Sequence, residues 1–145
     1  MLVIYERVLP VILLAEDNED DVFFFNRSLN RIGVTNPVQV VYNGEDALAY
    51  LKGTGIYADR TKYPLPSLCV FDIKMPRLTG LEVLQRLRED PAFNDLAVIV
   101  WSTSTYSKEQ ELANQLGAKA YLVKPTVPGE LDATFQSIIQ QWLPE

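Results

Sequence analysis

The 145-residue sequence contains no histidine and only one cysteine, Cys69. The absence of histidine excludes Ser-His-Asp and Cys-His catalytic units, histidine-ligated zinc, and a phosphohistidine carried by this chain. A single cysteine provides neither a disulfide framework nor a cysteine metal site, and its place in an apolar run predicts a buried thiol. Any chemistry must therefore be done by carboxylates, hydroxyls, lysine and arginine.

The sequence also lacks an excess of basic residues and a long apolar run. Its net charge of −6 argues against a nucleic-acid-binding surface, because affinity for the phosphate backbone depends on clustered lysine and arginine. No apolar stretch has the length of a membrane span, and Glu6 and Arg7 interrupt the N-terminal segment, which is therefore not typical of a signal peptide. We expect a cytoplasmic globular protein that binds neither nucleic acid nor a membrane.

Short apolar runs alternate with amphipathic stretches along the chain. The runs predict five strands, at Val8–Ala15, Val38–Asn43, Ser67–Asp72, Leu96–Ser102 and Lys119–Val123. Helical spacing and glycine stop signals predict a helix after each strand, at residues 22–32, 44–53, 81–89, 108–116 and 129–143. Five β–α units in succession imply a single α/β domain with a doubly wound parallel sheet.

Polar residues follow four of the predicted strands. The first strand ends at Glu16 and Asp17, and the third ends at Asp72. The fourth strand ends at Ser102, and Lys124 follows the fifth. Each residue alone is more often a turn residue, a helix cap or a solvated charge. In an open parallel sheet, however, these ends meet at the edge where ligands bind, so their joint occurrence predicts a site.

Three carboxylates brought together at this edge repel one another. Two unit charges 4 Å apart interact by about 4 kcal/mol at an effective dielectric constant of 20. A Mg²⁺ ion (or Mn²⁺) would offset that repulsion, because these hard cations prefer carboxylate, carbonyl and water oxygens. Asp72 could then act as a nucleophile on phosphorus, with the metal and Lys124 stabilising charge. The residues therefore predict a phosphoryl-transfer site.

Four segments together resemble the receiver domain of two-component response regulators: LLAEDNEDD, VFDIKMPRLTGLEVLQRLR, VIVWSTS and GAKAYLVKP. The resemblance extends from about Pro10 onward and implies a (βα)5 flavodoxin-like fold with strand order 2-1-3-4-5. It implies one receiver domain at residues 1–145 with no output domain. Residues 1–9 would be an N-terminal extension, and residues 54–66 an extended loop before the third strand.

The resemblance also implies roles for the residues at the strand ends. Asp72 corresponds to the phosphoacceptor, which receives a phosphoryl group from a histidine of a partner kinase. Asp17 corresponds to a metal-ligating acid, and Glu16 to the neighbouring acid that often acts through a water. The backbone carbonyl of Lys74 corresponds to a further metal ligand, whereas its side chain is expected to be solvated.

Further roles concern phosphoryl binding and the conformational switch. Lys124 corresponds to the lysine that pairs with a phosphoryl oxygen, and the Lys124–Pro125 peptide is typically cis in receivers. Ser102 corresponds to the switch hydroxyl, and Tyr121 to the aromatic residue that moves inward with it. The side chain of Ser104, which flanks the site, is expected to be solvated.

The acidic run after the first strand is expected to divide into two parts. Glu16 and Asp17 would belong to the metal site. Asn18 is placed to cap the first helix, with Asp21 three residues later in an arrangement like a capping box. The acids of residues 19–21 would then mainly complement the positive end of the helix dipole.

The expected partner is a sensor histidine kinase. The long segment Gly53–Ser67 resembles the small receivers paired with bacterial phytochrome-type kinases, although a surface loop stiffened by proline explains it equally well. The face of the fourth helix, fifth strand and last helix is expected to form a homodimer. Two alternatives stay open. One is a phosphorylation-independent pseudo-receiver that acts as a binding module. The other is a phosphatase with an aspartyl-phosphate intermediate, which the lysine at position 74 disfavours because such enzymes place a second aspartate there.

Overall fold

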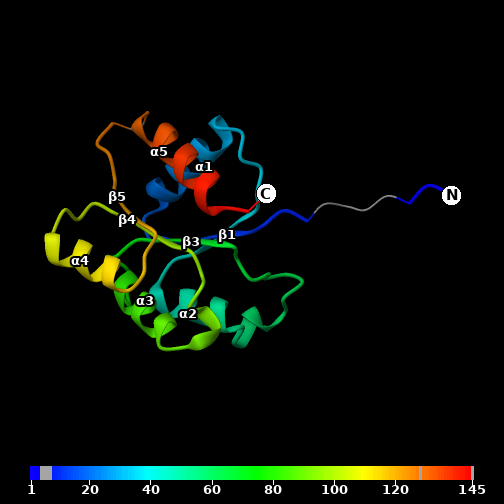
Figure 1. Ribbon diagram of the computed structural model, residues 1–145, viewed down its shortest axis with the longest axis horizontal. Coiled ribbons are helices and arrows are strands. Elements are labelled where there is room, and N and C mark those ends of the chain that lie inside the picture. The colour runs from blue at the N-terminus through cyan, green and yellow to red at the C-terminus, as the bar shows by residue number, and fades with distance from the viewer. Residues whose placement is uncertain (4–7, 128, 145) are drawn as a thin grey trace.

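The computed structural model describes residues 1–3, 8–127 and 129–144, which form a parallel sheet between two layers of helices (Figure 1). The strands are β1 (Ile12–Ala15), β2 (Val38–Val41), β3 (Leu68–Phe71), β4 (Val98–Ser102) and β5 (Ala120–Val123). Their order in the sheet is β2-β1-β3-β4-β5. The predicted doubly wound α/β fold and its strand order are confirmed.

The helices are α1 (Glu19–Arg31), α2 (Gly44–Lys52), α3 (Gly80–Arg88), α4 (Ser107–Gln115) and α5 (Glu130–Trp142), with short 3₁₀ turns at Gly55–Ala58 and Pro91–Phe93. Helices α1 and α5 cover one face of the sheet, and α2, α3 and α4 cover the other (Figure 1). Within the described ranges, no helix has the length and apolar character needed to cross a membrane.

Apolar side chains fill the space between the sheet and each helix layer. On the α1 and α5 side, the rings of Phe25, Trp101 and Phe135 pack with centroid separations of 5.1–5.8 Å. On the opposite side, Tyr50 of α2 and Leu84 of α3 are buried against β1 and β3. Because both faces of the sheet are covered, its central strands are fully buried, as their continuous apolar sequences predict.

The strand register brings the predicted site residues to one edge of the sheet. Ala15, the last residue of β1, pairs with Val41 of β2 and with Phe71 of β3. Ser102, the last residue of β4, pairs with Val123 of β5. The residues that follow these strands therefore leave the sheet side by side, as expected at the carboxyl edge of a parallel sheet.

The first strand begins later than predicted. The prediction of a strand from Val8 is wrong, since regular pairing starts at Ile12, opposite Val38. Pro10 lacks a backbone N–H and cannot donate to a strand ladder. Its carbonyl instead accepts a hydrogen bond of 2.9 Å from the Asn36 side chain. The bounds of the other elements differ from the prediction by at most two residues, and α1 begins at Glu19, directly after its predicted cap Asn18.

The segment between α2 and β3 is packed against the body of the domain. The Arg60 guanidinium donates to the carbonyls of Tyr50 at 2.7 Å and of Tyr63 at 3.2 Å. The rings of Tyr50, Tyr57 and Tyr63 lie 5.0–5.9 Å apart, and the Tyr50 hydroxyl donates to the Pro64 carbonyl at 2.7 Å. Burial raises the pKa of Tyr50 to about 12. These contacts attach the segment to α2 despite its length.

Gly80, at the start of α3, fixes the backbone that follows β3. A Cβ atom at this position would lie 2.1 Å from the Asp72 carbonyl oxygen, so Gly80→Ala must displace the backbone there. We expect this substitution to lower the free energy of unfolding by about 1–3 kcal/mol. A Cβ at Gly129 meets nothing within 4 Å, so Gly129→Ala should change stability by less than about 0.5 kcal/mol. Urea denaturation of both variants measures the difference, and equal effects would contradict this account.

Candidate functional site

Three carboxylates meet at the carboxyl ends of β1 and β3. Glu16, Asp17 and Asp72 each offer an oxygen atom, and these atoms all lie within 4.8 Å of one another. Glu16 is fully buried, Asp72 is 6% exposed, and Asp17 is exposed to solvent. A set of three carboxylates, open on one side, fits a hard divalent cation such as Mg²⁺.

The Lys124 ammonium lies among these acids. It donates hydrogen bonds to Glu16 at 2.5 Å, to Asp21 at 2.8 Å and to Asp72 at 3.2 Å. Its side chain is only 7% exposed and also lies over the Trp101 ring, with Nζ 4.8 Å from the ring centroid. One buried cation therefore offsets part of the negative charge of the cluster.

Burial and charge shift the pKa values of this pair. Burial raises the pKa of Glu16 to about 7; the hydrogen bond from Lys124 opposes the shift and the charge of Asp72 adds to it. Burial acts to lower the pKa of Lys124, but its hydrogen bonds to Asp21 and Glu16 raise that pKa above its ordinary value. Lys124 therefore stays protonated. Ionisation of the Glu16 carboxyl is therefore unfavourable, and a bound cation would reduce its free-energy cost.

Asp21 belongs to this cluster, so the predicted division of the acidic run is wrong at this residue. Asn18 caps α1 as predicted, because its side-chain oxygen accepts the N–H of Asp21 at 3.0 Å. The Asn18 N–H, however, donates to Glu16 at 3.2 Å, and the Asp21 carboxylate accepts from Lys124. The helix-start pattern gives no sign of this contact, since Lys124 is remote in the sequence.

Ser102 lies at the end of β4, where its carbonyl accepts the N–H of Lys124 at 2.8 Å, and Tyr121 lies on the neighbouring β5. Ser102 is fully buried, and its hydroxyl oxygen accepts the N–H of Ser104 at 3.2 Å. The Tyr121 hydroxyl donates to the Ser104 carbonyl at 2.8 Å. Ser104 itself is half-buried and donates to Glu109 at 2.7 Å, so the expectation of a solvated Ser104 side chain is wrong. The loop between β4 and α4 therefore joins Ser102 to Tyr121.

Two expectations concern the remaining positions. Lys74 lies in the loop after β3, two residues beyond Asp72, and its side chain is exposed as predicted. The expected cis peptide at Lys124–Pro125 is wrong, because every peptide bond of the described residues is trans. The trans form of an X–Pro bond is favoured by about 0.5–1 kcal/mol where nothing in the surroundings selects the cis form.

Comparison with known proteins gives consistent matches over nearly the whole chain. The family model described as "Response regulator receiver domain" matches residues 12–136. Response regulator Rcp1 of Synechocystis sp. (strain PCC 6803) is 28% identical over 133 residues, which cover 92% of this chain and 88% of Rcp1. The Mn²⁺-bound structure of Rcp1 superposes with a TM-score of 0.82 at 27% identity, covering 94% of this chain and 99% of Rcp1.

Two other solved structures are at least as similar. One is a phosphorylated cyanobacterial phytochrome response regulator, RcpA, with a TM-score of 0.85 and 29% identity. The other is response regulator RPA3017, described in red light signalling of R. palustris, with a TM-score of 0.87 and 34% identity. Each alignment covers 94% of this chain and 99% of the other.

Proposed function

The chain belongs to the response regulator receiver domain family of two-component signalling, and on that premise we propose that it accepts a phosphoryl group on Asp72. The donor is a phosphohistidine of a sensor kinase, and the reaction depends on Mg²⁺ or Mn²⁺. The observation that carries this proposal is the meeting of three carboxylates with the Lys124 ammonium at one edge of the sheet.

Glu16, Asp17 and Asp72, with the backbone carbonyl of Lys74, would hold the metal ion. The ion supplies charge stabilisation for the phosphoryl oxygens. The Asp72 carboxylate forms an O–P bond while the P–N bond of the donor breaks, and the histidine nitrogen leaves with the electron pair. Lys124, already 3.2 Å from Asp72, pairs with a phosphoryl oxygen of the product.

The same site can operate a two-state switch. In the structure, the Ser102 hydroxyl oxygen accepts a hydrogen bond from the N–H of Ser104, and the Tyr121 hydroxyl donates one to the Ser104 carbonyl. A phosphoryl group on Asp72 provides a new acceptor for the Ser102 hydroxyl. Because both residues bond to Ser104, movement of Ser102 changes the position available to Tyr121. The phosphoryl group thus favours one member of a pre-existing pair of conformations.

Ser102→Ala should separate phosphorylation from the switch. We expect this variant to accept the phosphoryl group and to lose most of the phosphorylation-dependent change at the Tyr121 ring. The reason is that the Ser102 hydroxyl, which links the phosphoryl group to Tyr121, is missing. NMR of the Tyr121 ring signals in the presence and absence of the phosphoryl group measures this change. Ser107→Ala, an exposed serine at the start of α4, serves as the control. A full Tyr121 response in Ser102→Ala would contradict the switch.

The partner proposal rests on the relatives and on the exposed surface. RcpA is described as a phytochrome response regulator, which supports a phytochrome-type histidine kinase as the donor. We expect the two proteins to meet in the cytoplasm. Three large hydrophobic side chains are exposed on this side of the molecule. They are Tyr106, just before α4, Leu112, on α4, and Val123, on β5. They support a homodimer through the face of α4, β5 and α5, which sedimentation at several protein concentrations would detect.

Two alternatives make different demands. A pseudo-receiver would bind partners without phosphorylation, but here oxygen atoms of Glu16, Asp17 and Asp72 lie within 4.8 Å of one another and Lys124 donates to Asp72. A phosphatase with an aspartyl-phosphate intermediate places a second aspartate two residues after the nucleophile, and here that position is the exposed Lys74. Repeated turnover of a phosphomonoester would favour the phosphatase, whereas a single stable adduct favours the receiver.

Incubation with acetyl phosphate tests the proposal. With Mg²⁺ present, we expect an adduct that is stable in acid and labile in alkali, as an acyl phosphate is. With EDTA in place of Mg²⁺, the adduct should not form. Labelling that is independent of the metal, or an adduct with the opposite lability, would reject the proposed mechanism.

A further inference from the structure

The hydrogen-bond donors of the Lys124 ammonium are all in use. An ammonium group carries three N–H bonds, and those of Lys124 point to Glu16 at 2.5 Å, Asp21 at 2.8 Å and Asp72 at 3.2 Å. A phosphoryl oxygen can therefore pair with Lys124 only by replacing one of these carboxylates. The bond to Asp72 is the longest, and Asp72 is also the residue that would carry the phosphoryl group. This bond is therefore the one that the phosphoryl oxygen replaces.

The two acceptors that remain, Glu16 and Asp21, differ in what else they would bind. Glu16 is one of the three clustered carboxylates, so a bound cation would share its oxygen atoms with Lys124. Asp21 is not in that set, and its carboxylate accepts from Lys124 alone among the hydrogen bonds of the described residues. The bond between Asp21 and Lys124 is therefore the one that neither the cation nor the phosphoryl group would disturb.

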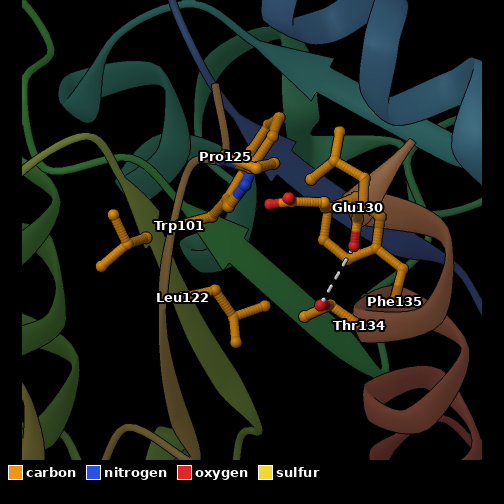
Figure 2. A pocket seen from close by; sticks show the side chains of 8 residues that line it. Trp101, Leu122, Pro125, Glu130, Thr134 and Phe135 are labelled. Atoms are coloured by element: carbon orange, nitrogen blue, oxygen red, sulfur yellow. Dashed lines mark hydrogen bonds between the residues drawn. The ribbon is translucent and has the colours of Figure 1, made fainter. Parts of the chain in front are cut away.

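The Trp101 ring bounds the ammonium on its buried side. Nζ of Lys124 lies 4.8 Å from the centroid of this ring, which itself packs on Phe135 with centroids 5.5 Å apart. Figure 2 shows Trp101 at one wall of a cavity of about 110 Å³, which is also lined by Phe135 and by Pro125, the residue after Lys124. Because Trp101 is almost fully buried and the Asp21 side chain is 26% exposed, Asp21 is the contact that fixes the ammonium on the solvent side.

We propose that Asp21 is a positioning residue for phosphorylation, which holds the Lys124 ammonium where a phosphoryl oxygen on Asp72 can accept one of its N–H bonds. This inference rests on the proposed function, since it concerns the lysine beside the acceptor residue. When the phosphoryl group arrives, one of its oxygens accepts the N–H that Asp72 accepted before, and the bond to Asp21 remains. Asp21 thus acts through Lys124 and makes no contact with the phosphoryl group.

Two substitutions of Asp21 separate positioning from a general effect of charge. Asp21→Ala removes the acceptor, whereas Asp21→Asn removes the charge and keeps an oxygen atom that can accept the Lys124 N–H. With acetyl phosphate and saturating Mg²⁺, we expect Asp21→Ala to be labelled at least about tenfold more slowly than the native chain, as loss of a hydrogen bond between charged groups implies. A neutral acceptor gives about half the free energy of an ionised one, so Asp21→Asn should be slowed by only about threefold.

The ammonium signal of Lys124 in ¹⁵N NMR spectra reports its position without any phosphorylation, and Lys124→Arg assigns that signal. A buried ammonium held by three acceptors exchanges its protons slowly with water, so the native chain and Asp21→Asn should give a sharp signal. In Asp21→Ala the signal should be broadened by exchange. Asp20→Ala, which removes an exposed acid from the same first turn of α1, is the matched control and should change neither the signal nor the labelling rate.

Three results would overturn the positioning role of Asp21. The first is labelling of Asp21→Ala at the native rate or faster, because relief of charge repulsion alone would speed the reaction. The second is equal slowing of Asp21→Ala and Asp21→Asn, which would show that only the charge matters. The third is an unchanged Lys124 ammonium signal in Asp21→Ala. A native chain that takes up no label would instead reject the proposed function, whatever the ammonium signal shows.

Discussion

An Asp72→Asn protein is expected to take up no phosphoryl group from acetyl phosphate in the presence of Mg²⁺. An asparagine amide lacks the second carboxylate oxygen and the charge needed to form an acyl phosphate. The substitution should leave the fold intact, because Lys124 keeps its bonds to Glu16 and Asp21 and remains paired. Loss of labelling in a folded protein would then report the chemistry of Asp72 itself.

The control for this variant is Asp20→Asn. Asp20 is an exposed acid in the first turn of α1, and its replacement makes the same chemical change without touching the cluster. It should be labelled as fast as the native chain, and the circular dichroism of both variants should match that of the native chain. Labelling of Asp72→Asn at the native rate would show that another residue is the acceptor.

The second large effect is expected for Asp17→Asn, which should weaken Mg²⁺ binding by about a hundredfold or more. Asp17 contributes one of the three clustered carboxylate charges. A unit charge 4 Å from another is worth about 4 kcal/mol at an effective dielectric constant of 20, and the larger charge of the ion increases that value. Because Asp17 is exposed, its replacement should have little effect on stability. Calorimetric titration with Mg²⁺ measures the affinity, and labelling by acetyl phosphate should fall with it.

Asp20→Asn again serves as the control, because Asp20 is in the same acidic run but is not one of the three clustered carboxylates. It should bind Mg²⁺ as the native chain does. If both variants lose affinity equally, the ion is held by the diffuse charge of the whole run, and the assignment of Asp17 fails. If neither loses affinity, the ion binds elsewhere.

The sequence predicts the parallel sheet and the residues that meet at its carboxyl edge because both follow from the apolar runs and the strand register. Continuous apolar runs specify buried parallel strands, and the strand register then brings the residues after β1 and β3 together. Glu16, Asp17 and Asp72 could thus be predicted to meet without any knowledge of side-chain conformation. Lys124, after β5, follows from the same rule.

What the sequence did not predict depends on contacts between remote parts of the chain. The sequence assigns Asp21 mainly to the start of α1, yet in the fold its carboxylate accepts a hydrogen bond from Lys124, which is remote in the sequence. Ser104 lies in a polar segment that is typical of a solvated loop. In the fold, however, its backbone N–H bonds to Ser102 and its carbonyl accepts from Tyr121. Local patterns contain no information on such pairs.

The most direct measurement of the central claim is to map the acceptor residue in the unaltered chain. Borohydride reduces an acyl phosphate to an alcohol, so an aspartyl phosphate is converted to homoserine. After incubation with acetyl phosphate and Mg²⁺, reduction and proteolysis, mass spectrometry should find homoserine at position 72 alone. Modification at Asp17 or Asp21 instead, or no homoserine in a chain that binds Mg²⁺, would contradict the account.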